Sequence, residues 1–164
     1  MFALFTPRRR VLAVCRANLC RSPMVESILQ RELHRRGLQG RFRAESAGSE
    51  VAMIGRRPDV RAQRALERAG GADMSRHRAR SIKRLALARY DYILAVDNVV
   101  YEQLYALTEL GASERLQKLM AYAPQGLADE LPDPYFGPES GFQVVLDMLE
   151  ATVPRFLDSW VGEE

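Results

Sequence analysis

The chain has little of several residue types that would point to particular classes of protein. Of its 164 residues only two are cysteine and two are histidine, and lysine supplies 2 of the 24 basic side chains. Two cysteines, Cys15 and Cys20, do not make the disulfide framework of a small secreted protein. The histidines, His34 and His77, lie far apart without the spacing of metal ligands, so we expect no bound metal. We interpret the scarcity of lysine as a bias of the genome rather than a function.

Long hydrophobic runs are also missing. No segment approaches the roughly 18 consecutive apolar residues of a membrane-spanning helix. At the N-terminus a very short apolar piece precedes three arginines, which is the reverse of the charge order in a secretory signal. We therefore expect a cytoplasmic protein without a membrane span. The length fits a loosely attached tail over residues 1–8 and a single domain over 9–164.

Charge is distributed unevenly along the chain. Residues 1–90 carry 21 basic and 7 acidic side chains, whereas residues 91–164 carry 3 basic and 14 acidic ones. Such a field attracts anionic substrates and acidic partners, although the two halves could also neutralise each other within one folded body. Nucleic acid is not an expected partner, because no aromatic–basic interleaving or binding motif accompanies the charge. The opposed halves are compatible with a monomer or with weak self-association.

One stretch combines residue types suited to holding and attacking a phosphate. An apolar run over 11–14 ends at Cys15, and Ser22 follows as an expected N-cap with Pro23 at the first helical position. A short loop between a buried strand and a helix forms an anion-binding nest at the positive end of the helix dipole. The helix N-terminus and Arg21 both favour a thiolate at Cys15, and Arg21 offers a planar fork of donors for phosphate oxygens.

Apolar runs and helical periodicity alternate along the rest of the chain. They predict strands over 9–15, 41–47, 90–96 and 116–122. They also predict helices that end at Gly37, Gly70 and Gly111, the second and third capped by Asp59 and Asp97, and a last helix over 142–160 that Pro154 kinks or interrupts. This pattern predicts a three-layer α/β fold, with a four-stranded parallel sheet flanked by helices and the phosphate-binding loop after the first strand.

A thiolate that attacks a phosphate ester needs an acid to protonate the leaving oxygen. The best candidate is Asp133, which lies between Pro132 and Pro134 and is followed by Tyr135 and Phe136. The prolines stiffen the segment, and the aromatic side chains could form an apolar wall beside the site. We expect the carboxyl group to be partly buried against these rings, an environment in which it keeps its proton.

Several short motifs follow one another along the chain. They are Val14-Cys15, Asn18, Cys20-Arg21-Ser22-Pro23, Ser46-Ala47-Gly48, Arg61-Ala62, His77-Arg78-Ala79-Arg80, Tyr90-Asp91-Tyr92-Ile93-Leu94 and Asp133-Pro134-Tyr135. In this order they resemble the low-molecular-weight protein tyrosine phosphatase family, and the resemblance covers roughly residues 9–158. It implies an enzyme that removes phosphate from phosphotyrosine in proteins without a metal or organic cofactor.

The resemblance also implies a role for each residue of the site. Cys15 attacks phosphorus and forms a cysteinyl-phosphate, Arg21 holds the phosphoryl oxygens, and Asp133 acts as acid and then activates water. The rest of the loop binds the phosphate as well: Arg16, Ala17, Asn18, Leu19, Cys20 and Ser22. Within it, Asn18 braces the loop and Ser22 donates a hydrogen bond to the sulfur.

The resemblance also implies a supporting network, a redox partner for Cys15 and a partner protein. It places Ser46 and His77 in a supporting network near Asn18. It makes Cys20 the partner that traps an oxidised Cys15 as a reversible disulfide. Family members in bacteria often act on an autophosphorylating tyrosine kinase, so such a kinase is a candidate partner by analogy.

Two positions depart from the family pattern. Many members carry an aromatic residue after the second strand as one wall of the substrate slot, whereas this chain has Ala52 and Met53 there, opposite the expected wall of Tyr135 and Phe136. Arg16 follows the nucleophile directly, where an apolar residue is common. Both changes bear on selectivity for aryl phosphates, and Arg16 could instead recruit an acidic stretch beside the phosphotyrosine.

Two other functions are alternatives. Arsenate reduction occurs on the same fold but needs further cysteines to pass a disulfide outward, and the chain has none beyond Cys20. A non-catalytic phosphate-binding or redox-sensing module would keep the loop without turnover. Asp133 argues against such a module, because binding alone has no use for an acid at that place.

Overall fold

The computed structural model describes residues 6–107 and 114–163, and within them strands and helices alternate. The four strands are β1 (Arg9–Cys15), β2 (Phe42–Gly48), β3 (Tyr92–Ala95) and β4 (Leu116–Lys118). The α-helices are α1 (Arg21–Arg35), α2 (Val60–Arg68), α3 (Asn98–Tyr105) and α4 (Ser140–Val161), and the 3₁₀ helices are η1 (Ile82–Arg84), η2 (Leu87–Arg89) and η3 (Leu119–Tyr122). All strand pairs are parallel, in the order β2-β1-β3-β4, which confirms the predicted four-stranded parallel sheet.

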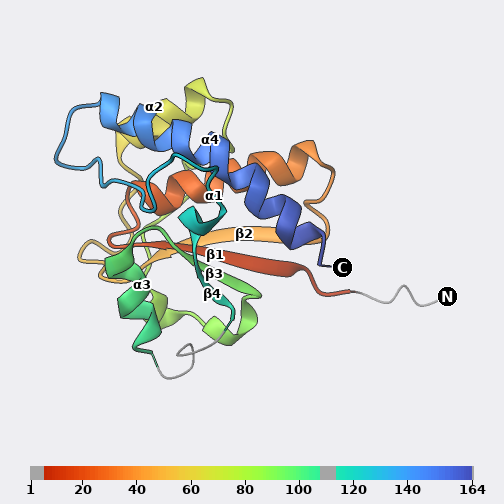
Figure 1. Ribbon diagram of the computed structural model, residues 1–164. Coiled ribbons are helices and arrows are strands. Elements are labelled where there is room, and N and C mark those ends of the chain that lie inside the picture. Colours follow the sequence, from red (N-terminus) through yellow and green to blue (C-terminus); the bar gives the residue numbers. More distant parts are fainter. Residues whose placement is uncertain (1–5, 108–113, 164) are drawn as a thin grey trace.

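The sheet is the middle of three layers. Helices α1, α2 and α4 cover one face, and α3 covers the other (Figure 1). Residues of β1 alternate between the two faces, with Val11 and Ala13 packed in the cluster that includes α1 and α4, and Leu12 and Val14 in the cluster that includes α3. Because both faces are covered, residues 11–15 of the strand are buried, which explains the unbroken apolar run over 11–14.

The order of the strands fixes where the site lies. The chain passes from β1 through α1 to β2 on one side of β1, and later places β3 on the other side. Parallel sheets bind ligands beyond the carboxyl ends of the strands, at the point where the strand order reverses. The loop over 16–20, between β1 and α1, leaves the sheet at that point.

The predicted fourth strand is too long. β4 ends at Lys118, and residues 119–122 form η3 instead. Leu116 packs in the cluster on the α3 side of the sheet, whereas Leu119 and Met120 pack in the cluster with α4. The chain therefore leaves the sheet edge within one apolar run. The third strand is also shorter than predicted, because Tyr90 is the C-cap of η2 and β3 begins only at Tyr92.

The predicted helix boundaries are partly right. α1 begins at Arg21 with Cys20 as N-cap, so the prediction of Ser22 as N-cap is wrong and Ser22 lies inside the helix. Pro154 does not interrupt α4, because the residues beyond it are buried in the core and this packing outweighs one missing hydrogen bond. The alternative, a kink at Pro154, stays a prediction. Asp59 and Asp97 cap α2 and α3 as predicted. The predicted end of the third helix at Gly111 and residues 1–5 of the tail lie outside the described residues.

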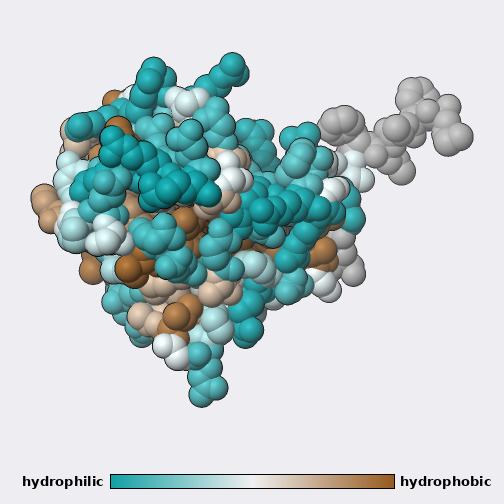
Figure 2. All heavy atoms as spheres, turned by 90° about the horizontal axis from the view of Figure 1, so that it is seen from above, coloured by the Kyte–Doolittle hydropathy of each residue, from teal (hydrophilic) through white to brown (hydrophobic). Residues whose placement is uncertain are grey.

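The outer surface over α2 and α4 is mostly hydrophilic, with hydrophobic residues in small patches (Figure 2). Across the part of the chain that the structure describes, no helix has both the length and the apolar character needed to cross a membrane.

Candidate active site

The loop after β1 curls around the sulfur of Cys15. Asn18 adopts a φ of 58°, and it is the one non-glycine residue with positive φ in the described ranges. Asparagine tolerates this left-handed backbone better than most residues. The turn brings the Asn18 N–H to 3.2 Å from Cys15 Sγ, and the Ser22 hydroxyl lies 3.0 Å from the same atom. The sulfur is thus buried, with two polar groups directed at it.

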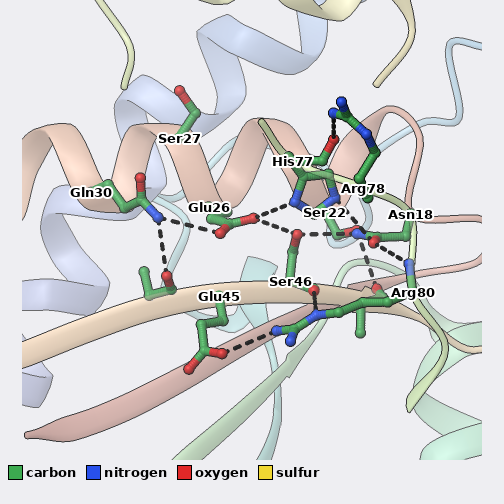
Figure 3. A network of polar contacts seen from close by, with 12 residues as sticks. Asn18, Ser22, Glu26, Ser27, Gln30, Glu45, Ser46, His77, Arg78 and Arg80 are labelled. Carbon is green, nitrogen blue, oxygen red and sulfur yellow. Dashed lines mark hydrogen bonds and ion pairs between the residues drawn. The ribbon is translucent and has the colours of Figure 1, made fainter. Parts of the chain in front are cut away.

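A hydrogen-bond network behind the loop fixes the side chain of Asn18 (Figure 3). Its Oδ1 accepts from the Arg80 N–H at 3.1 Å, which sets the orientation of the amide. Its Nδ2 then donates to the hydroxyls of Ser22 and Ser46, at 2.8 and 3.0 Å. His77 Nε2 lies 3.1 Å from Oδ1 and therefore donates to it. The structure brings Ser46 and His77 together at Asn18.

Glu26 completes this network, and the sequence did not point to it. Its Oε2 accepts from the Ser46 hydroxyl at 2.6 Å and lies 3.3 Å from His77 Nδ1. Gln30 donates to its Oε1 at 3.2 Å. Both ring nitrogens of His77 thus face acceptor oxygens, one from Asn18 and one from Glu26. A usable signal was the spacing, since Glu26 follows Ser22 by one helical turn on α1.

Arg21 is held from the side away from the loop. Its side chain is 5% exposed, and one nitrogen, Nη1, donates to Asp97 Oδ2 at 2.6 Å and to the Leu131 carbonyl at 3.1 Å. Within the described residues, Nε and Nη2 have no hydrogen-bond acceptor, and Nη2 lies 3.7 Å from Asp133 Oδ2. These two adjacent N–H directions form the fork that matches two oxygens of a phosphate. Asp97, predicted only as a helix cap, is the principal counter-ion of Arg21.

Asp133 lies beside Arg21 but is not buried. Its side chain is 49% exposed, against the expectation of a carboxyl partly buried by aromatic rings. The reason is that Phe136 turns outward and is 94% exposed, so it does not cover the carboxyl. The Tyr135 N–H donates to Asp133 Oδ1 at 3.1 Å and holds the group at the mouth of the site.

The segment that carries Asp133 is anchored by Arg61 from α2. The guanidinium donates to the carbonyl oxygens of Tyr135 and Gly137, at 2.9 and 3.2 Å, and lies over the ring of Tyr135. Asp59 holds Arg61 in turn through both carboxylate oxygens. Burial alone would raise the pKa of Asp59, but the hydrogen bonds from Arg61 outweigh it and keep this pKa below its ordinary value. Arg61 belonged to a motif of the sequence, but its role was not predicted.

A cavity of about 800 Å³ opens above Cys15. The predicted residues that line it are Arg16, Ala17, Leu19, Cys20, Arg21, Ala52, Met53, Asp133, Tyr135 and Phe136. The other predicted residues, Asn18, Ser22, Ser46 and His77, are not part of this lining. The predicted set therefore divides into an inner wall and a support behind it.

The wall formed by residues 51–54 is fixed close to the loop by Gly48. A Cβ atom at this position would lie 2.7 Å from the Arg16 carbonyl oxygen and 2.4 Å from Val51 Cγ2, so only glycine fits. Beyond it, the N–H groups of Ser49 and Glu50 donate to the carbonyls of Cys15 and Arg16, at 2.9 and 2.8 Å. The side wall is thus attached to the loop through its backbone.

Arg16 is already paired. Its Nε donates to Glu50 Oε2 at 2.9 Å, and Gln103 from α3 donates to the other oxygen of Glu50. This hydrogen bond uses Nε alone, and the Arg16 side chain is 67% exposed, so the hypothesis that Arg16 recruits an acidic stretch of a substrate stays a prediction.

Cys20 is a buried thiol five residues after Cys15. Burial, together with the charges of Asp59 and Cys15, raises the pKa of Cys20 to about 12. The thiol is therefore neutral at physiological pH. Both cysteines are free.

A buried cysteine at the end of a strand and a buried arginine at the start of the next helix, joined by a short loop at the carboxyl edge of a parallel sheet, are the arrangement of cysteine-based phosphatases. The family model described as low molecular weight phosphotyrosine protein phosphatase matches residues 10–164. The chain belongs to this family, whose members are hydrolases.

Individual relatives agree with this assignment. A Schizosaccharomyces pombe low molecular weight phosphotyrosine protein phosphatase is 32% identical over 138 residues, which is 84% of this chain and 87% of the relative. The crystal structure of YfkJ from Bacillus subtilis superimposes with a TM-score of 0.89 at 29% identity, and covers 97% of this chain and 98% of its own. The YwlE arginine phosphatase from Geobacillus stearothermophilus gives a TM-score of 0.80 at 25% identity, with 94% of each chain covered.

Proposed function

We propose that the chain hydrolyses phosphotyrosine in proteins, with Cys15 as nucleophile, Arg21 as phosphate holder and Asp133 as general acid. The observation that carries the proposal is their convergence. All three line one cavity, and Arg21 Nη2 lies 3.7 Å from Asp133 Oδ2. The family name of the matching model supports a phosphotyrosyl protein as substrate.

In the first step, the thiolate of Cys15 attacks phosphorus. The S–P bond forms while the P–O bond to the tyrosyl oxygen breaks, and Asp133 donates its proton to the leaving phenolate. The Asn18 N–H and the Ser22 hydroxyl donate to the sulfur and stabilise its charge before attack. Arg21 and the N-terminus of α1 stabilise the charge on the transferring phosphoryl oxygens.

In the second step, water replaces the phenol. Asp133, now a carboxylate, accepts a proton from a water molecule as its oxygen attacks phosphorus. The S–P bond breaks, inorganic phosphate forms, and the thiolate of Cys15 and the protonated Asp133 are restored. The half-exposed position of Asp133 supports this step, because water reaches the carboxyl without a change of the fold.

Four finer proposals accompany this function. The chain acts in the cytoplasm, as a monomer or with weak self-association, on substrates that include an autophosphorylating tyrosine kinase. A peroxide oxidises Cys15 to a sulfenic acid, and Cys20 then forms the disulfide as water leaves. Support for the disulfide is that both thiols are free and lie on one short loop.

Phosphate release from three peptides tests the function, with phosphotyrosine, phosphoserine or phosphoarginine at one position. Phosphoarginine is included because one structural relative is an arginine phosphatase. We expect hydrolysis of phosphotyrosine alone, no turnover by Cys15→Ser, and a loss of about 10²–10⁴-fold in Asp133→Ala. Asp129→Ala, an exposed acidic residue nearby, is the matched control and should keep full activity. Phosphate binding without turnover by the wild type would overturn the proposal in favour of a binding module.

A further inference from the structure

Two basic residues at the mouth of the cavity have no acidic partner. Lys83 and Arg84 lie on η1, line the cavity and are exposed. In residues 6–107 and 114–163, no carboxylate lies within ion-pair distance of either one. The other charged lining residues are neutralised within the site: Arg16 by Glu50, and Arg21 by Asp97 and Asp133. The mouth thus carries two uncompensated positive charges on one side.

The position of these two charges is fixed by the fold. The Ser81 hydroxyl caps η1, because it accepts a hydrogen bond from the Lys83 N–H. Ile82, which lies between Ser81 and Lys83, is buried. Arg80, just before the turn, donates to the Ser46 carbonyl and to Glu45 Oε1, at 3.0 and 3.1 Å. The turn is therefore attached to β2, the same strand that leads into the side wall of the cavity.

Glu45 makes this attachment strong. It also accepts from Arg10 at 2.7 Å and is buried. Burial would raise the pKa of Glu45, but the hydrogen bonds from Arg10 and Arg80 keep it below its ordinary value. The carboxylate stays charged at neutral pH, so η1 presents Lys83 and Arg84 from a rigid base.

Apolar residues flank the same side of the mouth. Met53 and Ile54 are 41% and 57% exposed, and Gly55 is tied to the segment before η1 by its N–H bond to the Ala79 carbonyl at 2.8 Å. Because the phosphate group is taken up by the loop below, these exposed residues are available to the chain that flanks it. The surface beside the phosphate site is thus apolar next to the wall and cationic at η1.

We propose that this surface selects phosphotyrosine segments with acidic residues beside the phosphotyrosine, and that Lys83 and Arg84 are the specificity-determining residues. The proposal rests on the proposed function, since it names the substrate class of that site. Aspartate or glutamate side chains of the substrate provide the missing partners of the two cations. Two exposed ion pairs correspond to a preference of about 2- to 30-fold in kcat/KM.

The test compares two phosphotyrosine peptides that differ only in their flanking residues, aspartate and glutamate in one and alanine in the other. The measured quantity is the ratio of kcat/KM for the acidic and the neutral peptide. We expect wild type to prefer the acidic peptide about 2- to 30-fold, with a preference that shrinks as salt rises. The double variant Lys83→Ala/Arg84→Ala should bring the ratio close to one, and Lys83→Glu/Arg84→Glu should reverse it.

The matched control is Arg68→Ala/Arg89→Ala. It removes two exposed arginines that lie outside the cavity lining and have no ion pair in the described part of the chain. It changes the net charge as the double alanine variant does, and its ratio should equal that of wild type. If the ratio of kcat/KM falls as much in the control as in the double alanine variant, the preference for the acidic peptide is an effect of overall charge. If this ratio is unchanged in the Lys83/Arg84 variants, the proposal is overturned. If wild type hydrolyses neither peptide, the proposed function itself fails.

Discussion

Replacing Asp97 by asparagine tests whether the buried Arg21 depends on a single carboxylate. Asp97 uses its two oxygens separately: Oδ1 caps α3 through the Val100 N–H at 2.8 Å, and Oδ2 accepts from Arg21 at 2.6 Å. Asparagine keeps the cap, because its amide oxygen also accepts from the N–H. It loses the ion pair, since its amide N–H₂ then faces the guanidinium, donor against donor.

The loss of stability follows from the surroundings of Arg21. Its side chain is 5% exposed, and after the change it retains the Leu131 carbonyl and the half-exposed Asp133. A hydrogen bond to a charged group contributes about 1.5–3 kcal/mol. In a chain of this size each kcal/mol shifts Tm by about 2–4 °C, so we expect Tm to fall by about 3–12 °C.

Inorganic phosphate supplies the negative charge that the variant lacks. An anion in the loop pairs with Arg21, so saturating phosphate should stabilise Asp97→Asn more than wild type and narrow the difference in Tm. The rate should still fall, because a guanidinium with fewer contacts is less well placed for the transition state. We expect kcat/KM to decrease by about 10- to 100-fold.

Calorimetry with and without phosphate, together with kinetics on a phosphotyrosine peptide, measures both effects. Glu150→Gln is the matched control, because it removes the carboxylate partner of Arg31, which is buried on the same helix but away from the loop. The control should lose stability, keep its kcat and respond to phosphate as wild type does. If Asp97→Asn melts like wild type, or gains no more from phosphate than Glu150→Gln, the dependence of Arg21 on Asp97 is refuted.

Three further predictions concern groups around the site. Burial raises the pKa of Cys20 to about 12. In the variant Cys15→Ser, the Cys20 thiol should therefore react with iodoacetamide at pH 8 at least about tenfold more slowly in the folded than in the unfolded chain. Mass spectrometry measures both rates, and equal rates would contradict the raised pKa. Burial opposes ionisation of Glu45, but hydrogen bonds from two arginines keep its pKa below the ordinary 4.5, so its contribution to stability is complete above that pH and is lost as pH falls through the folded value. Glu45→Gln should consequently have a lower Tm than wild type at pH 7, and the two Tm values should converge as the pH falls through the folded pKa of Glu45. A difference in Tm that is independent of pH would exclude this linkage. Arg61→Met releases the segment that carries Asp133. The kcat for phosphotyrosine should therefore fall more than the kcat for p-nitrophenyl phosphate, because the leaving group of p-nitrophenyl phosphate needs less protonation. An equal decrease of the two kcat values would mean that Arg61 does not act through Asp133.

The sequence alone predicted two kinds of element correctly: a strand that is buried on both faces, and helices whose caps depend on neighbouring residues. β1 is covered on both faces, so its apolar run from Val11 to Val14 has one interpretation. Asp59 and Asp97 predicted α2 and α3 correctly because a helix cap depends on neighbouring residues only. β4 was predicted too long because Leu119 packs against a different layer from its strand, and an apolar run does not show where the chain changes its packing partner.

The groups that we propose to react lie in short motifs, whereas their supporting partners come from distant segments. Glu26 reaches Ser46 across 20 residues, and Asp97 reaches Arg21 across 76. The local signal of Glu26 was only its spacing from Ser22 on α1, and Asp97 has the pattern of an ordinary helix cap. Asp97 nevertheless carried one usable signal, since it follows a buried strand that ends at the same edge of the sheet as β1.

The shape of the phosphate loop depends on contacts that no single segment supplies. Asn18 holds the left-handed turn, and its side-chain amide is bound by Ser22, Ser46, His77 and Arg80. These partners belong to α1, β2 and the segment before η1, so a displaced Asn18 would lose contacts with all three at once. The loop is therefore set before a substrate arrives, and its dipoles need no reorganisation during the reaction. Because they act on the transition state through this preset shape, residues such as Ser46 and His77 should affect kcat more than KM although they lie outside the cavity lining.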